Sequence, residues 1–293
     1  MTWYLKLIFS FLICTGALAS KDLIIKLLFN NGVSFSQIIF YTGVFGLASS
    51  VILVGLKKDP VKVNEIRYQV SRMFIVAISG ALVFYSFKLL SPTVINIGSK
   101  MTLPIMIILS SLFSLPYSRK EKTLAALTLL VMLTFFYQAM AADFTALLGL
   151  GILLLSTFVM IAEYMTLNHT VRTESPALIS SVPSLSLIIL GCILSYSLNE
   201  SLVLDGYSQL PFLTLCGFFY FVVYYSGVIR YKILPPGLAE FPSLLTILIV
   251  WPVDKLFFGG NISPNTLVFG MVAIVMVGYI IHEHRKSVIP PIS

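Results

Sequence analysis

Charged residues are scarce in this 293-residue chain. They make up 11% of the sequence, whereas hydrophobic residues make up 58% and the mean hydropathy is +0.96. A soluble domain carries about 25% charged residues, so this chain has too few polar side chains to cover a water-soluble globule. The composition therefore predicts a protein that is embedded in lipid.

Paired cysteines and common cofactor motifs are also missing. The three cysteines, Cys14, Cys192 and Cys216, lie in apolar stretches without a CxxC pair, so we expect small core side chains and no disulfide framework. No GxGxxG, GxxxxGK[ST] or GxSxG string occurs, and His282-Glu283-His284 lacks the HExxH spacing of a zinc site. We therefore expect no cofactor, no metal site and no hydrolase or nucleotide-binding loop.

Long apolar segments recur along the whole chain, separated by short loops. A spanning helix needs roughly 20 mostly apolar residues, and runs such as 147–161 lack the alternation of a transmembrane β-strand. The sequence thus predicts an all-α integral membrane protein of about ten transmembrane helices. The expected spans are 4–29, 34–56, 72–91, 93–115, 122–140, 145–169, 176–198, 209–232, 236–257 and 265–284.

The first segment has two interpretations. Lys6, the apolar run 7–13 and Ala17-Leu18-Ala19 resemble a cleavable signal peptide with an A-x-A site. The alternative is a retained first helix, which we favour because the internal repeat described below requires it.

Basic residues lie mainly in the connections on one side of the predicted membrane. This positive-inside bias predicts that both termini are cytoplasmic, in a cell membrane of the bacterial inner-membrane kind. It also accounts for the net charge of +7 without a nucleic-acid partner. The residues assigned to the cytoplasmic side are Lys57, Lys58, Lys62, Arg67, Arg72, Arg119, Lys120, Lys122, Arg172, Arg230, Lys232, Arg285 and Lys286.

Two short strings match at an offset of 144 residues: 87–92 (FKLLSP) and 231–236 (YKILPP). The same offset aligns the first five predicted helices with the last five. We therefore predict two five-helix repeats, 1–144 and 145–293, in one transmembrane unit. Because five is odd, the second repeat enters the membrane from the opposite side, which is a recurring plan of secondary transporters.

These features resemble the drug/metabolite transporter superfamily, in its EamA-like ten-helix branch. The resemblance covers nearly the whole chain and includes Pro104 and Gly270, while 21–26 and 36–47 resemble S-adenosylmethionine uptake members. Tyr41 stands where many members carry Arg, a departure from the pattern. The resemblance implies a central cavity lined by the first, third, fourth, sixth, eighth and ninth helices.

Lys100 and Asn96 share one face of the predicted fourth helix, and Glu240 is the repeat equivalent of Asn96. Ionisable residues within a membrane are costly and usually face a cavity or a partner. One hypothesis is a substrate site in which Lys100 holds a carboxylate or phosphate and Glu240 holds an amine or sulfonium. The other is a Lys100–Glu240 ion pair that locks the halves together.

Glu163 lies deep in the predicted sixth helix. It either binds and releases a proton, which would couple transport to a gradient, or forms a buried pair with Lys21 or Arg230. Asp22 is a further site candidate, and Glu163, Asp22, Lys21 and Arg230 are the residues expected to serve coupling or gating. We expect Lys26 to be an interfacial residue that pairs with Asp22.

Asp254 and Lys255 mark an outer gate or the membrane interface. Aromatic rings stack on substrates and bind cations, and several are candidates for the inner face. These are Tyr41, Phe84, Tyr85, Tyr164, Tyr220, Tyr224 and Tyr225.

The leading hypothesis is a secondary transporter, either an exchanger or a proton-coupled carrier, of a small amphoteric metabolite such as S-adenosylmethionine or an amino acid. A non-transporting scaffold or sensor is the alternative. A membrane enzyme is less favoured because no catalytic cluster is apparent in the sequence.

Overall fold

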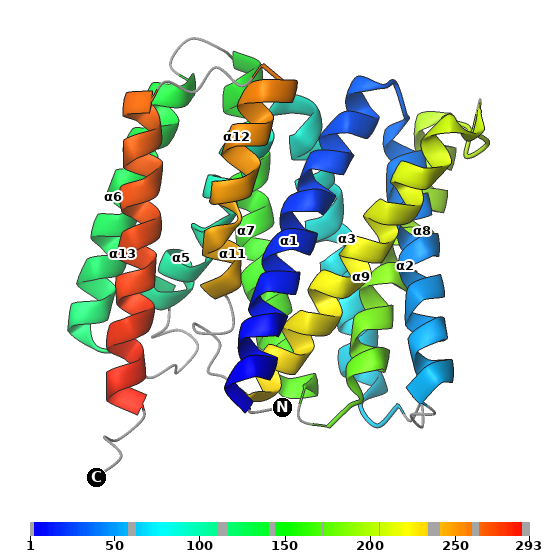
Figure 1. The fold of residues 1–293 in the computed structure, drawn as a ribbon. Helices are drawn as coiled ribbons and strands as arrows, with labels where there is room; N and C mark the ends of the chain where they lie inside the picture. The colour runs from blue at the N-terminus through cyan, green and yellow to red at the C-terminus, as the bar shows by residue number, and fades with distance from the viewer. Residues whose placement is uncertain are drawn as a thin grey trace.

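Apolar runs of the sequence form helices throughout the part of the chain that the structure describes. This computed structural model describes residues 3–57, 63–109, 117–140, 144–171, 173–204, 206–233, 241–259 and 264–288. The long helices lie roughly along one direction (Figure 1). In chain order the elements are α1 (Trp3–Asn30), α2 (Phe35–Lys57), α3 (Ile66–Leu89), α4 (Pro92–Ser99), α5 (Thr102–Ile108), α6 (Arg119–Met140), α7 (Phe144–Thr170), α8 (Pro176–Leu198), the 3₁₀ turn η2 (Tyr207–Gln209), α9 (Leu210–Ile233), α11 (Phe241–Leu245), α12 (Ile247–Phe257) and α13 (Pro264–Val288).

α4, α6 and α8 each begin at a capping residue that can be recognised from the sequence. Ser91 and Ser175 each precede a proline, and their hydroxyls accept hydrogen bonds from the backbone N–H of Val94 and Leu178 at the starts of α4 and α8. A serine satisfies an orphan N–H there, and proline is well suited to the first helical position. α6 begins with a reciprocal capping box between Ser118 and Glu121.

The helices pack in two groups. α1, α2, α3, α7, α8 and α9 form a first lobe, in which α2 lies against α8 and α9, α3 against α7, and α1 against α9. α4, α5, α6, α11, α12 and α13 form a second lobe, in which α6 lies beside α13 and α4 beside α12. Figure 1 shows α6 and α13 side by side at one edge, with α2 and α8 near the other.

Glycines allow the backbones of the first lobe to approach closely. A Cβ at Gly191 of α8 would lie 2.7 Å from Cα of Phe40 in α2, and one at Gly217 of α9 would lie 2.8 Å from N of Gly46. Small residues at such crossings are a common way of packing helices in membranes.

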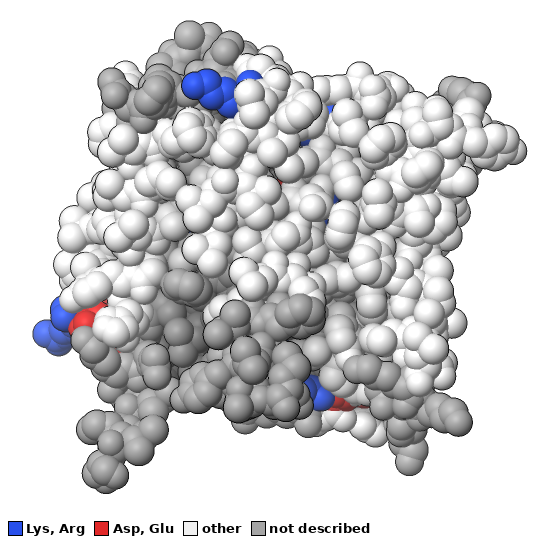
Figure 2. Space-filling view, in the orientation of Figure 1, with Lys and Arg blue, Asp and Glu red and all other residues white. Residues whose placement is uncertain are grey.

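The outer surface is mostly apolar. Five helical segments are long and apolar enough to cross a membrane, and two shorter apolar segments, Pro92–Ile108 and Leu267–Ile280, accompany them in the described ranges. In Figure 2 the visible Lys, Arg, Asp and Glu form small patches at the upper left, the left edge and the lower edge, and most of this face is uncharged. The all-α architecture is as predicted, and the apolar surface fits a membrane-embedded protein.

The predicted fourth and ninth helices differ from the structure, because each is interrupted. α4 ends at Ser99 and α5 begins at Thr102, while Thr246 separates α11 from α12. Pro104 explains the first interruption: it has no N–H to donate to the carbonyl of Lys100, four residues earlier. The backbone tightens there to i→i+3 bonds, such as Lys100 N–H to Ile97 O at 3.1 Å.

Candidate functional site

A cavity of about 180 Å³ lies between the two lobes. The first lobe contributes residues of α1, α3, α7 and α9, and the second lobe contributes α4, the α4–α5 interruption and α11. These segments correspond to the six helices that the family resemblance implies for a central cavity.

Charged side chains of both signs line this cavity. Among the lining residues that the structure describes, Lys21, Lys100 and Arg230 are basic, whereas Asp22 and Glu163 are acidic. All five are at least 92% buried. Burying charges costs free energy unless partners compensate them, so their convergence makes this cavity the candidate site.

Two of the charges belong to α1. The Nζ of Lys21 lies 2.9 Å from Oδ1 of Asp22, which makes a close ion pair on the cavity wall. The expected pairing of Asp22 with Lys26 is not what the structure shows. Instead, Nζ of Lys26 donates to the carbonyls of Phe87 and Leu90 at the end of α3, at 2.9 and 3.1 Å.

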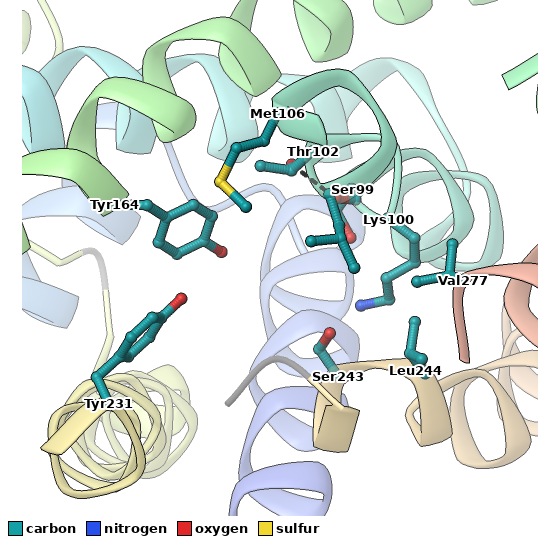
Figure 3. A pocket seen from close by; sticks show the side chains of 10 residues that line it. Ser99, Lys100, Thr102, Met106, Tyr164, Tyr231, Ser243, Leu244 and Val277 are labelled. Carbon is teal, nitrogen blue, oxygen red and sulfur yellow. Dashed lines mark hydrogen bonds between the residues drawn. The ribbon is translucent and has the colours of Figure 1, made fainter. Parts of the chain in front are cut away.

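Lys100 lies at the interruption between α4 and α5. Figure 3 shows its side chain directed toward Ser243 and Leu244 of α11, with Tyr164 and Tyr231 across the pocket. The hydroxyl of Thr102 donates to the carbonyl of Ser99 at 2.8 Å and so stabilises the local turn. A broken helix thus positions a basic group between the lobes.

Glu163 and Arg72 form a buried pair that the sequence analysis did not foresee. Nη2 of Arg72 lies 4.0 Å from Oε1 of Glu163, and the hydroxyl of Ser79 lies 3.4 Å from Oε2. The sequence predicts Arg72 in the connection before the third helix, which is wrong because it lies inside α3 and is fully buried. The spacing of Arg72, Val76, Ser79 and Val83 on one helical face was the available signal.

Arg230 was likewise assigned to the cytoplasmic side but is 96% buried in the last turns of α9. Its Nη1 donates to the hydroxyl of Ser226 at 3.2 Å. The positive-inside count therefore included two residues that belong to the interior.

Aromatic rings form much of the remaining wall. Tyr220 and Tyr224 lie one helical turn apart on α9 with their ring centroids 4.9 Å apart, and Phe84 of α3 packs edge-on against Tyr220 at 6.4 Å. Tyr164 lies 6.0 Å from Tyr231, which the sequence analysis missed. Tyr231 follows Tyr224 at a spacing that places it on the same face of α9 as Tyr220 and Tyr224. The helical periodicity could therefore have predicted that Tyr231 faces the cavity.

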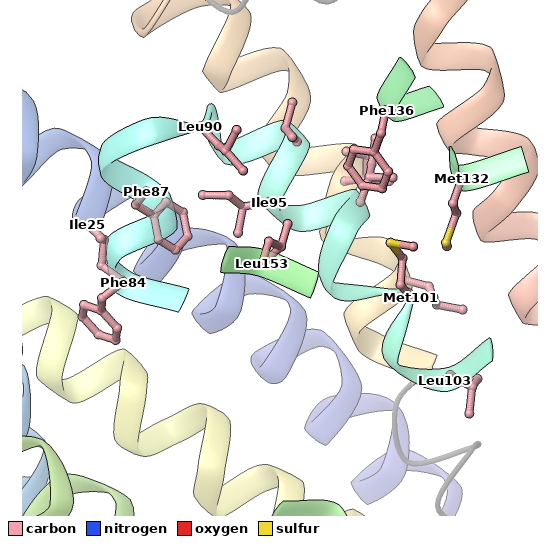
Figure 4. Packing of buried hydrophobic residues seen from close by; sticks show 14 of the residues in the cluster. Ile25, Phe84, Phe87, Leu90, Ile95, Met101, Leu103, Met132, Phe136 and Leu153 are labelled. Atoms are coloured by element: carbon pink, nitrogen blue, oxygen red, sulfur yellow. The ribbon is translucent and has the colours of Figure 1, made fainter. Parts of the chain in front are cut away.

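An apolar cluster packs beside the cavity, near the junction of α3 and α4. Apolar residues of α1, α3, α4 and α7, including Ile25, Phe87 and Leu153, form a dense cluster there (Figure 4). Asp254 of α12 is buried in the same region, and its Oδ2 accepts a hydrogen bond from Thr93 N–H at 3.1 Å. The cavity extends toward Leu167 and Tyr231, near the ends of α7 and α9.

Four of the predicted site residues are not brought to the cavity by the described structure. The Tyr41 hydroxyl donates to the carbonyl of Leu202, at 3.1 Å, and Tyr85 packs against Phe35 with Lys88 over its ring. Tyr225 stacks on Phe221. Asn96 bonds to Thr246 instead of lining the cavity, and Glu240 lies outside the described residues.

Asn96 links the two interrupted helices. It is 99% buried, and its Oδ1 accepts a hydrogen bond of 2.8 Å from the hydroxyl of Thr246 at the α11–α12 interruption. Because the cavity wall does not include Asn96, the structure indicates that it joins these elements.

We expect Thr246→Val to lower the free energy of unfolding by about 1 to 3 kcal/mol, since Asn96 would lose its buried donor. Because neither Asn96 nor Thr246 lines the cavity, the KM of the exchange reaction proposed below should change less than twofold. Thermal unfolding in detergent and transport kinetics measure the two effects. A large rise in KM with unchanged stability would instead place Asn96 in the binding site.

Comparisons with known proteins add information on the fold. No family model and no curated protein matches the sequence. Fourteen chains of solved structures match the fold. One of them, described only as the crystal structure of a protein, aligns with a TM-score of 0.67 and 14% identity over 96% of this chain and 98% of that chain. At this identity the match shows a shared fold alone.

Proposed function

We propose that this protein is a secondary active transporter, an exchanger or a proton-coupled carrier, of a small amphoteric metabolite. The observation that carries the proposal is the cavity between two helical lobes, lined by buried groups of both signs. A substrate that bears a carboxylate or phosphate and also an amine or another cation would find a complementary partner for each end. S-adenosylmethionine and amino acids are the first compounds to test.

The two interrupted helices support a carrier mechanism. In many secondary transporters the substrate site is formed near the membrane midplane by discontinuous helices. Here the interruptions at Lys100 and Thr246 differ by 146 residues, close to the 144-residue offset of the proposed repeat. Lys100 lies on the cavity wall, so the first interruption contributes directly to the site.

The packing of the helices supports two inverted five-helix repeats, 1–144 and 145–293. The repeat offset equates α1 with α7, α2 with α8, α3 with α9 and α6 with α13. If each helix is replaced by its repeat equivalent, the α3–α7 contact becomes an α9–α1 contact. In the same way the α2–α9 contact becomes an α8–α3 contact. All four of these contacts occur in the structure. The α2–α8 and α6–α13 pairs map onto themselves, as expected at a two-fold axis.

Ten membrane crossings follow from this arrangement if α4 with α5 and α11 with α12 each count as one interrupted span. α1 begins and α13 ends at the same edge of the bundle in Figure 1, as an even number requires. We infer that this edge is cytoplasmic because Arg67, Arg119 and Lys120 begin helices there. The cavity would then face the cytoplasm.

Counterflow in proteoliposomes tests the proposal. Vesicles with the purified protein are loaded with one unlabelled compound from a panel that includes S-adenosylmethionine and the amino acids, and uptake of the labelled compound is followed. Saturable uptake that requires the internal compound establishes an exchanger. Accumulation driven by an imposed pH gradient from empty vesicles establishes proton coupling.

A non-transporting scaffold or sensor is the second candidate, and a membrane enzyme is a weaker third. A scaffold needs no charged cavity, and a sensor or an enzyme needs no site that is divided between two inverted repeats. Binding of a panel compound without any counterflow, from protein that unfolds cooperatively, would favour the sensor.

A further inference from the structure

Arg72 does not line the cavity, and it is one of the largest fully buried side chains that the structure describes. Its Nη1 donates to the carbonyl of Ile179 on α8 at 2.7 Å. Its Nε and Nη2 make no hydrogen bond to any residue that the structure describes. One carbonyl cannot balance the charge of a guanidinium in an apolar interior.

The compensating charge is the carboxylate of Glu163, 4.0 Å from Nη2 of Arg72. Arg72 therefore stands behind Glu163, anchored between α3 and α8, while Glu163 lines the cavity from α7. Arginine does not release its proton in proteins. If Glu163 took up a proton, a buried guanidinium would lose its counter-charge, and that loss is strongly unfavourable.

We propose that Arg72 is a positioning residue that keeps Glu163 as a fixed negative charge on the cavity wall, where it contacts a cationic group of the substrate. This inference rests on the proposed function and specifies one part of it. Glu163 is then a binding contact and not a proton carrier, which favours the exchanger.

The surroundings of Glu163 suit a cationic group. Tyr220 and Tyr224 of α9 line the same cavity as Glu163, and Phe84 packs edge-on against Tyr220. Aromatic faces together with a carboxylate favour organic cations. Asp22, the other acid on the described wall, already has the ammonium of Lys21 at 2.9 Å. The remaining titratable groups on that wall are Cys14, Lys100, Tyr164, Arg230 and Tyr231.

The ion pair itself is tested by thermal unfolding of the full-length protein in detergent. R72Q leaves Glu163 without its compensating charge and should lower the melting temperature by about 10 °C. R72K keeps the charge and should lose less than half as much. The double variant R72Q/E163Q removes both charges and should melt within a few degrees of the wild type. Strictly additive losses in the double variant would overturn the pairing.

The role of the pair in binding is tested with choline and its neutral isostere, 3,3-dimethylbutan-1-ol, at constant ionic strength. Choline at 100 mM should raise the melting temperature of the wild type and R72K more than the isostere does. In R72Q/E163Q the two compounds should give the same small shift. An equal response to both compounds in the wild type, or an undiminished choline shift in the folded double variant, would overturn the proposal.

Transport kinetics separate this inference from the proposed function. R72Q/E163Q should raise the KM for an exchanged cationic compound by about tenfold, with a maximal rate within about twofold of wild type. If the wild type exchanges nothing, the transporter proposal fails while the choline result still decides the role of Arg72. If the wild type exchanges a cationic compound and the double variant keeps its KM, the inference alone fails.

Discussion

Lys100→Met should reduce counterflow of an anionic or amphoteric substrate by about 10- to 100-fold. Lys100 is 94% buried at the α4–α5 interruption and is directed into the space between the lobes (Figure 3). A hydrogen bond to a charged group contributes about 1.5–3 kcal/mol, and about 1.4 kcal/mol corresponds to tenfold in affinity. Methionine is one atom shorter than lysine and keeps a flexible apolar stem, while the charged ammonium and its hydrogen-bond donors are removed.

Lys255→Met is the matched control. Lys255 is exposed at the end of α12, with its ammonium over the ring of Trp251 at 5.8 Å. Loss of this surface charge should leave both counterflow and stability nearly unchanged. If Lys100→Met retained full counterflow at wild-type KM, Lys100 would be a structural residue, and the ion-pair hypothesis for Lys100 and Glu240 would gain weight.

Gly191→Ala should lower the melting temperature by about 5–10 °C. The added Cβ would lie 2.7 Å from both Cα and Cβ of Phe40 and 2.8 Å from its backbone N. Backbone atoms cannot rotate away as a flexible side chain can, so α2 and α8 would have to separate along their whole contact. Overpacking of this kind costs about 1–3 kcal/mol, and about 2–4 °C corresponds to 1 kcal/mol in a protein of this size class.

Gly151→Ala provides the comparison within the same protein. Gly151 is also inside a long helix, α7, but a Cβ there would meet no other atom within 4 Å. Since alanine favours a helix over glycine, this substitution should leave the melting temperature unchanged or slightly higher. Equal effects of the two substitutions, measured by thermal unfolding in detergent, would contradict the close α2–α8 packing.

Much of the local structure was predictable because it depends on nearby residues. The length and apolar character of the segments predicted helices, and Ser91-Pro92 and Ser175-Pro176 marked two of their starts. The burial of Lys100 and Glu163 was also expected from their positions deep in apolar runs. The interruption at Lys100 follows from Pro104, although the apolar run around this proline predicts one continuous helix.

The sequence did not determine which side of each helix faces the cavity. An amphipathic helix displays its inner face as an apolar stripe, but helices in lipid are apolar on nearly every side. Tyr41 and Tyr224 were therefore equally good candidates, although only Tyr224 reaches the cavity. The neighbouring helices decide this orientation.

By itself the sequence determined the helical class, the lipid-compatible surface and several helix starts, because composition, capping and proline act over a few residues. Only the tertiary structure decided that Arg72 lies behind Glu163, that Asn96 bonds to Thr246, and that the cavity lies between two lobes. Each of these contacts joins residues about 90 to 150 positions apart, and their geometry depends on how close the backbones come. At the crossings of α8 and α9 with α2, Gly191 and Gly217 set that separation.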